Sequence, residues 1–214
     1  MILLVGGEKG GTGKTTIATN LAVRRLQASG DLLLVDTDKQ GSASAWAAIR
    51  DGHEPSQRIT SVQKFGNTIP KEVIELSKRF KDVVIDAGGR DSIELRAAMT
   101  VADLLVIPTQ ASQFDVWTLG TINDLVLQAQ ALNPKLKAFV AVNRASTNPS
   151  VTEADEIQEL LEDFEQLSLC ETIIRDRIAY RKAAKSGLSV VELQPADDKA
   201  TNEINALYEE VFHG

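Results

Sequence analysis

The residues with the clearest chemical potential lie in a glycine-rich segment near the start of the chain. Five of the fourteen glycines fall within eight residues, namely Gly6, Gly7, Gly10, Gly11 and Gly13. An apolar run precedes this segment, and Lys14, Thr15 and Thr16 follow it where a helix is expected to begin. Glycines let backbone N–H groups turn inward around phosphate oxygens, and a helix N-terminus adds positive potential. The pattern therefore predicts a phosphate-binding loop in which Lys14 reaches the terminal phosphates and Thr15 ligates Mg²⁺.

Acidic residues follow two later apolar runs and could complete such a site. Asp36 and Asp38 come directly after the run Leu32–Val35, and a spacing of two on an extended chain sends both carboxylates to the same side. Asp86 follows the run Val83–Ile85 and precedes three small residues. A carboxylate in that position after a phosphate loop is typical of a water-mediated Mg²⁺ site. A single carboxylate after a strand is also a common helix cap, which is the structural alternative for each residue alone.

The elements that must position these residues alternate between short apolar runs and longer helical patterns. The apolar runs predict strands at Ile2–Val5, Leu32–Val35, Ile59–Val62, Val83–Ile85, Leu104–Ile107 and Ala138–Val142. Helices are predicted at Lys14–Ser29, Ser42–Asp51, Pro70–Arg79, Ser92–Thr100, Phe114–Leu132, Thr152–Leu167 and Thr201–Phe212. Unbroken apolar runs are typical of parallel strands that are covered on both faces. We predict one α/β domain over residues 1–214, with a doubly wound, mainly parallel sheet, helices on both faces and ligands at the carboxyl ends of the strands.

The composition limits the class of protein. A chain of 214 residues with 43% hydrophobic and 25% charged residues is typical of a soluble globular domain. No segment approaches the ~20 apolar residues needed to cross a bilayer. One cysteine, Cys170, and two distant histidines, His53 and His213, suggest neither a disulfide nor a zinc cluster. We therefore expect a cytoplasmic protein.

The run from Lys9 to Thr16, KGGTGKTT, resembles the deviant Walker A box of the ParA/MinD family of ATPases. The strict phosphate-loop pattern would have glycine at position 8, where this chain has Glu8. By this resemblance the ligand is ATP or ADP with Mg²⁺, and Lys9 and Lys14 are catalytic. Lys9 would cross a dimer interface to the partner's phosphates and act there as an arginine finger does. The alternative for Lys9 is a solvated loop lysine. The implied nucleotide contacts in this loop are Glu8, Lys9, Gly10, Gly11, Thr12, Gly13, Lys14, Thr15 and Thr16.

The resemblance also assigns roles further along the chain. Asp36-Thr37-Asp38 is similar to the family's second box, with Lys39 in place of the common proline, which implies that both aspartates hold the metal's water shell and orient the attacking water. It does not decide which of the two dominates hydrolysis. The implied metal-site residues are Thr15, Asp36 and Asp86. Asn143 and Arg144 match a pair that reads adenine in several relatives, although such a pair is also ordinary at a strand end.

Charge is distributed unevenly along the chain. A net charge of −7 and a pI near 5.0 argue against a protein coated with positive charge for nucleic acid. Glu153–Glu171 contains eight acidic residues and no basic one, which we interpret as the solvated face of an amphipathic helix. Residues 175–185 carry five basic residues and one acidic residue, so +5 − 1 = +4, and resemble the segment of partition ATPases that contributes to DNA binding. The predicted sequence-independent DNA contacts are Arg175, Arg177, Arg181, Lys182 and Lys185. A basic helix face that pairs with nearby carboxylates is the alternative.

Together these resemblances imply a small ParA-type ATPase that segregates plasmid or other cargo. We expect a homodimer when ATP is bound, nonspecific binding to nucleoid DNA, and a centromere-binding or cargo adaptor protein that stimulates hydrolysis. A metabolic, synthetase-like enzyme and a regulatory ATPase switch without DNA binding are the alternatives. Lys9 argues against the first alternative and the basic segment argues against the second. No membrane partner is expected, because the helix at Thr201–Phe212 contains three glutamates and no lysine or arginine.

Overall fold

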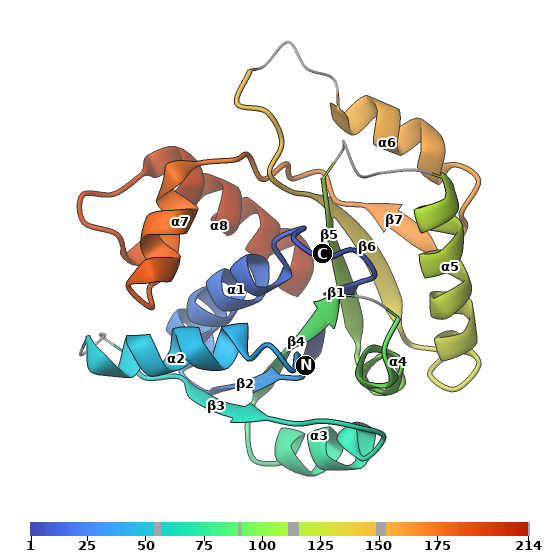
Figure 1. Cartoon of the computed structure of the whole chain (residues 1–214), viewed down its shortest axis with the longest axis horizontal. Helices are drawn as coiled ribbons and strands as arrows, with labels where there is room; N and C mark the ends of the chain where they lie inside the picture. Colours follow the sequence, from blue (N-terminus) through green and yellow to red (C-terminus); the bar gives the residue numbers. More distant parts are fainter. Residues whose placement is uncertain (54–56, 90, 111–115, 149–152, 214) are drawn as a thin grey trace.

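Within the described residues, seven strands form one sheet in which every pairing is parallel (Figure 1). The computed structural model describes residues 1–53, 57–89, 91–110, 116–148 and 153–213. The sheet order is β3-β2-β4-β1-β5-β6-β7. The strands are β1 (Ile2–Gly7), β2 (Leu32–Asp36), β3 (Thr60–Gln63), β4 (Asp82–Gly89), β5 (Leu104–Thr109), β6 (Lys137–Val142) and β7 (Leu167–Leu169). The predicted α/β class with a doubly wound sheet is confirmed.

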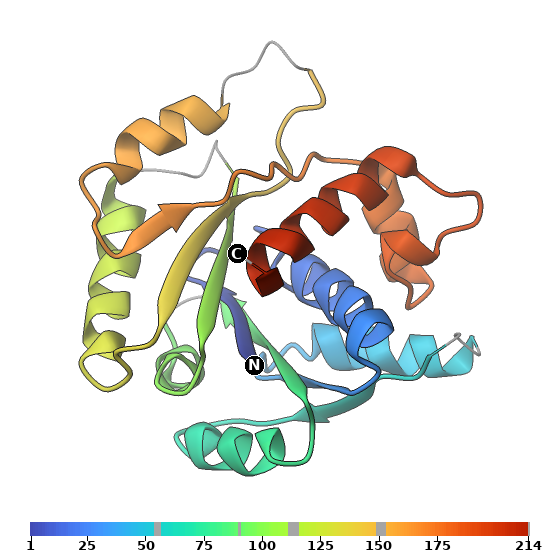
Figure 2. The ribbon, with the colours of Figure 1, turned by 180° about the vertical axis from the view of Figure 1, so that it is seen from behind.

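Helices cover both faces of this sheet. They are α1 (Lys14–Ser29), α2 (Ser42–Gly52), α3 (Ile69–Ser77), α4 (Ile93–Met99), α5 (Val116–Gln130), α6 (Glu153–Leu161), α7 (Ile178–Lys185) and α8 (Asp198–His213), with a short 3₁₀ helix η2 (Val190–Glu192). Helices α1, α2, α7 and α8 pack on one face and α3 to α6 on the other, as the two opposite views show (Figures 1 and 2). Among the residues that the structure describes, no helix is long and apolar enough to cross a membrane.

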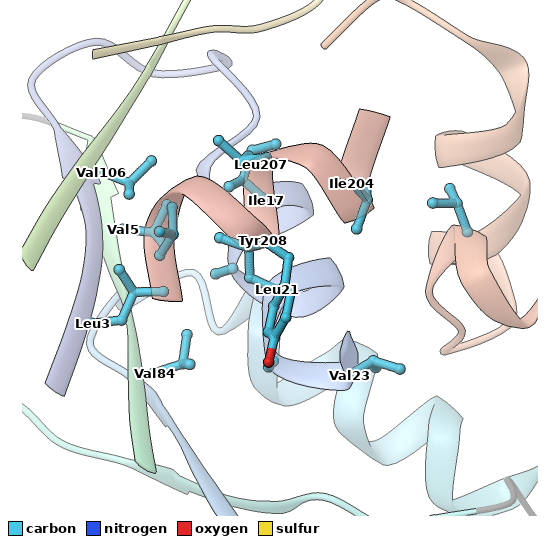
Figure 3. Packing of buried hydrophobic residues seen from close by; sticks show 14 of the residues in the cluster. Leu3, Val5, Ile17, Leu21, Val23, Val84, Val106, Ile204, Leu207 and Tyr208 are labelled. Carbon is cyan, nitrogen blue, oxygen red and sulfur yellow. The ribbon is translucent and has the colours of Figure 1, made fainter. Parts of the chain in front are cut away.

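The two hydrophobic cores explain why the strands are continuous apolar runs. In β1, Leu3 and Val5 face α1 and α8, whereas Leu4 between them faces the opposite core, and all three are fully buried. Figure 3 shows Ile17 of α1 and Leu207 of α8 packed together over the sheet residues on the first face. Since alternate residues of a strand point to opposite faces, a strand covered on both sides must be apolar at every position.

The helix predicted at Thr152–Leu167 is wrong at its carboxyl end, and its first residue lies outside the described part of the chain. Helix α6 ends at Leu161, and Leu167–Leu169 forms the edge strand β7, which pairs with β6. The acidic residues of Glu153–Glu171 therefore do not share one helix face. A three-residue strand has too few positions to show a strand pattern in the sequence, which is why β7 escaped prediction.

The remaining helix boundaries shift by a few residues. The predicted start at Phe114 lies outside the described residues, and α5 ends at Gln130. The last helix begins at Asp198 rather than at Thr201.

Strand β1 lies between β4 and β5, so the chain winds away from it in both directions along the sheet. The loop after β1 therefore opens at the topological switch point, where doubly wound folds bind their ligands.

Candidate nucleotide-binding site

A tight loop over residues 8–13 joins β1 to α1 at the switch point. Gly13 has a φ of +91°, and a Cβ atom there would lie 2.3 Å from Nδ2 of Asn143, so both the backbone angle and the space require glycine. That Nδ2 donates a hydrogen bond of 2.6 Å to the carbonyl oxygen of Thr12. Asn143 is 3% exposed and comes from the end of β6. The neighbouring strand thus fixes the shape of the loop.

Two further side chains hold the same loop from outside. Arg144 Nη1 and Gln110 Nε2 both donate to the carbonyl oxygen of Gly11, at 2.9 and 3.2 Å. Carbonyl groups committed to these donors leave the amide side of the loop for an anion. The predicted adenine-reading role of Asn143 and Arg144 stays a prediction, because the bonds that the structure shows serve the loop. Gln110 was missed, although it directly follows β5, the same strand-end position that pointed to the acidic residues.

Lys14 is buried in the wall of the site. Its Nζ donates to the carbonyl oxygen of Lys9 at 2.6 Å, and the residue is only 7% exposed. Burial lowers the pKa of the Lys14 ammonium, while the carboxylates of Asp86 and Asp38 oppose that shift. A phosphate in the site would offer this cation a stronger, charged acceptor than a backbone carbonyl. Lys14 thus lines the cavity, and its contact with the terminal phosphates stays a prediction.

Asp86 and Thr15 form a pair that fits a divalent cation. Thr15 Oγ1 donates to Asp86 Oδ2 at 2.7 Å, whereas the buried Asp86 Oδ1 has no hydrogen-bond partner among the described residues. Burial raises the pKa of Asp86 to about 7, and the charges of Asp36 and Asp38 add to the shift. A cation would supply the charge compensation that this carboxylate lacks. Mg²⁺ keeps several water and phosphate ligands and needs only one or two protein groups, such as this threonine–aspartate pair.

Asp36 and Asp38, which received the same prediction from the sequence, differ in their burial and in their hydrogen bonds. Asp36 is 0% exposed and accepts hydrogen bonds from the Asp38 amide at 3.0 Å and from both the amide and the hydroxyl of Ser44 at 2.8 Å. Its carboxylate therefore holds the first turn of α2, and the predicted role of Asp36 in holding the metal's water shell and orienting the attacking water stays a prediction. Asp38 is half-buried and lines the cavity next to Gly88, where an added Cβ would lie 3.1 Å from its carboxylate carbon.

An open cavity of about 590 Å³ lies at the carboxyl edge of the sheet. Loop residues, Lys14, Thr15, Thr16 and Asp38 line it. Tyr180, Arg181 and Ala184 of α7 also line it, and Figure 1 shows this helix beside α1. Tyr180 and Ala184 were not predicted as site residues, although their spacing of four places them on one helix face.

The five basic residues predicted to bind DNA have different surroundings. Arg177 forms a 2.6 Å ion pair with Glu203 of α8, with both side chains less than one-fifth exposed, and its role as a DNA contact stays a prediction. Arg175 donates to the carbonyl oxygen of Ser146 and, with Arg181, lines the cavity. Arg181 pairs with Asp176 at 2.8 Å, where both side chains are about half exposed. Lys182 and Lys185 are exposed on α7. The alternative of pairing with carboxylates thus holds for part of the segment.

Glu8 and Lys9 lie on the outer side of the loop and are both half-buried. Burial and the nearby Asp91 raise the pKa of Glu8, while Lys9 and Arg96 oppose the shift. The role of Lys9 in a partner subunit is not visible in one chain and stays a prediction.

A parallel sheet whose central strand leads into a glycine loop, with a buried lysine and a threonine–aspartate pair beside it, defines a P-loop nucleotide-binding protein. Residues 3–190 match the family model described as the CobQ/CobB/MinD/ParA nucleotide binding domain. The chain belongs to this family, and it is an ATPase of the ParA/MinD type.

Similar proteins cover almost the whole chain. It is 30% identical over 212 residues to maintenance of carboxysome distribution protein A of Halothiobacillus neapolitanus, covering 98% of this chain and 95% of that protein. It is 34% identical over 198 residues to the protein of the same name from Gloeobacter kilaueensis, covering 89% and 84%. The solved structure of apo McdA from Cyanothece has a TM-score of 0.74 at 22% identity and covers 98% of both chains.

Proposed function

We propose that this protein is a positioning ATPase that forms a homodimer on binding ATP and Mg²⁺, holds nonspecific DNA in that state, and releases it after hydrolysis. The observation that carries the proposal is that the phosphate loop and the basic helix α7 line one cavity. A nucleotide bound there contacts both the catalytic residues and the helix that carries Arg181, Lys182 and Lys185. Occupancy of the site can therefore alter how α7 meets a phosphate backbone.

In this proposal, different side chains bind the phosphates, hold the metal, orient the water and stabilise the developing charge. Lys14 and the amide groups of the loop bind the β- and γ-phosphates. Thr15 and Asp86 hold Mg²⁺, which neutralises phosphate charge when it is bound. We assign the attacking water to Asp38, because Asp38 lines the cavity, whereas both carboxylate oxygens of Asp36 accept hydrogen bonds from Asp38 and Ser44. Lys9 of the partner subunit stabilises the charge that develops on the transferred phosphoryl group.

The names of similar proteins support a proposal for the cargo and the adaptor. Two similar proteins are named for carboxysome distribution, and one of them is covered for 95% of its length. We propose a large cellular assembly as cargo, bound through an adaptor protein that stimulates hydrolysis. A plasmid is the other cargo class, which the resemblance to ParA-type partition ATPases implies; a similar protein of Rhizobium radiobacter, 24% identical over 147 residues, is named protein ParA.

Sedimentation and turnover test the nucleotide part of this proposal. Wild-type protein should be a monomer with ADP and a dimer with the slowly hydrolysed analogue ATPγS, whereas Lys14→Ala should remain a monomer with both. Lys9→Ala should still bind ATP but lose about 10²–10³-fold of its hydrolysis rate in the dimer. Lys39→Ala removes an exposed lysine beside the second box and is the matched control, expected to behave as wild type. A wild-type protein that sediments identically with ADP and ATPγS would contradict the proposal.

A further inference from the structure

Asn20 is a buried amide that the proposed chemistry does not use. It lies in α1, one turn after Thr16, and is 2% exposed. Its Nδ2 donates to the carbonyl oxygen of Thr16 at 2.7 Å, and its Oδ1 accepts from the Ser189 hydroxyl at 2.7 Å and from the Val190 amide at 2.9 Å. One side chain thus joins the first turns of the phosphate-loop helix to a segment 169 and 170 residues further along the chain.

Helix α2 holds the same distant segment. Arg50 is 1% exposed and forms a two-pronged ion pair with Glu192, with N–O distances of 2.7 and 2.8 Å, and it donates to the carbonyl oxygen of Gly187 at 3.0 Å. Trp46 Nε1 donates to the carbonyl oxygen of Leu188 at 3.3 Å. Gly187 has a φ of +63°, and a Cβ there would lie 2.3 Å from the Arg50 nitrogen, so the two backbones touch.

The residues 187–192, which we call the α7 anchor, directly follow the basic helix. Figure 1 shows α7 beside α1 and α2 on one side of the sheet. Both of these helices start in the nucleotide site. Helix α1 begins at Lys14, and the first turn of α2 is bonded to the carboxylate of Asp36 through Ser44. If the first turns of α1 and α2 shift when phosphates fill the loop, the α7 anchor, which is bonded to both helices, shifts with them.

We propose that Asn20 is a positioning residue that couples the nucleotide state to the basic surface of α7, with Arg50 as a second connection. The inference rests on the proposed function, because it concerns nucleotide-dependent DNA binding. A buried amide with three partners cannot lose one without leaving a polar group unsatisfied, so the Thr16 carbonyl and the α7 anchor move together. A side chain that only stabilised the fold would affect the ATP and ADP states equally.

The test compares DNA affinity in two nucleotide states. Binding of a fluorescent random-sequence DNA duplex is measured with ATPγS and with ADP, and the ratio of the two Kd values is the gating ratio. We expect Asn20→Ala to bind ATPγS as wild type does while its gating ratio falls about fivefold or more. The matched control is Asn205→Ala, which removes a different bond of α1, the 2.8 Å bond from Arg24 to α8, and should keep the wild-type ratio.

An unchanged gating ratio in Asn20→Ala, or an equal fall in Asn205→Ala, would overturn the inference. If Asn20→Ala does not fold, Ser189→Ala replaces it, since it removes one donor to the same amide and should lower the ratio by a smaller factor. Failure of the proposed function is distinguished by the wild-type protein, which would then bind DNA equally with ATPγS and ADP. In that case the inference fails together with the function on which it rests.

Discussion

At the scale of single residues, Asp86 is the clearest sign that the site is built for a cation. Its native pKa is raised to about 7, so the folded protein keeps a proton that the unfolded chain releases. The contribution of this group to stability is therefore present at low pH and is lost as the pH rises through about 7. A bound cation would remove that loss by stabilising the carboxylate.

This predicts a pH dependence that Asp86→Asn abolishes. Between about pH 6 and pH 8, nucleotide-free wild-type protein should lose about 1 kcal/mol more stability than the variant, or about 2–4 °C in Tm. The variant should also lose the stabilisation that Mg²⁺ adds to ATPγS binding. Thermal unfolding of both proteins across this pH range is the measurement. Parallel pH profiles for the two proteins would show that Asp86 is ionised without a cation.

The second residue-scale prediction separates the two aspartates of the second box. Asp38→Asn should keep ATP binding and Tm but lower the hydrolysis rate about 10²-fold or more, because it alters the side chain to which we assign the orientation of the attacking water. Asp36→Asn should instead lower the Tm, since its carboxylate accepts three bonds at the start of α2. Turnover and thermal unfolding of the two variants give the comparison. The reverse pattern would show that Asp36 is the hydrolytic residue.

At the scale of elements, the sequence predicts those helices and strands whose bounds are set by residues close by in the chain. Helix α1 has the predicted bounds, because a glycine loop precedes it and Gly30 ends it in a left-handed conformation. Strand β7 and the role of Arg50 could not be predicted in this way. A three-residue edge strand depends on β6 for its existence, and the partner of Arg50 lies 142 residues away. Contacts of that kind are decided by tertiary packing rather than by local pattern.

The ion pair between α2 and the α7 anchor predicts a large effect on stability. Arg50→Met should lower the free energy of unfolding by about 3–5 kcal/mol, because it leaves Glu192 with an uncompensated charge where the side chain is 10% exposed. Arg181→Met removes a pair that is about half exposed and should cost at most about 1 kcal/mol. Urea unfolding of both variants measures the difference. If both variants lost the same free energy of unfolding, burial would not determine how strongly the Arg50–Glu192 ion pair stabilises the fold.

At the scale of the whole molecule, the net charge of −7 conceals a divided surface. The basic residues predicted to contact DNA differ in their surroundings, since Arg177 is paired with Glu203 and both Arg175 and Arg181 line the nucleotide cavity. Lys182 and Lys185 remain as exposed cations of α7. A small patch on an acidic protein fits the proposed weak, salt-sensitive DNA binding, which the proposed dimer would strengthen by presenting two copies of the patch. The net charge alone could not reveal this division, because it depends on which side chains tertiary contacts engage.

The most direct test of the account is the salt dependence of DNA binding in two nucleotide states. With ATPγS, wild-type protein should bind a random-sequence duplex about tenfold or more tightly than with ADP. Replacing Lys182 and Lys185 by alanine should weaken ATPγS-dependent binding and make its salt dependence shallower. Replacing the exposed Lys135 and Lys137, which precede and begin β6, removes equal charge elsewhere and should change little. Equal DNA affinity of the wild-type protein with ATPγS and with ADP would contradict the account.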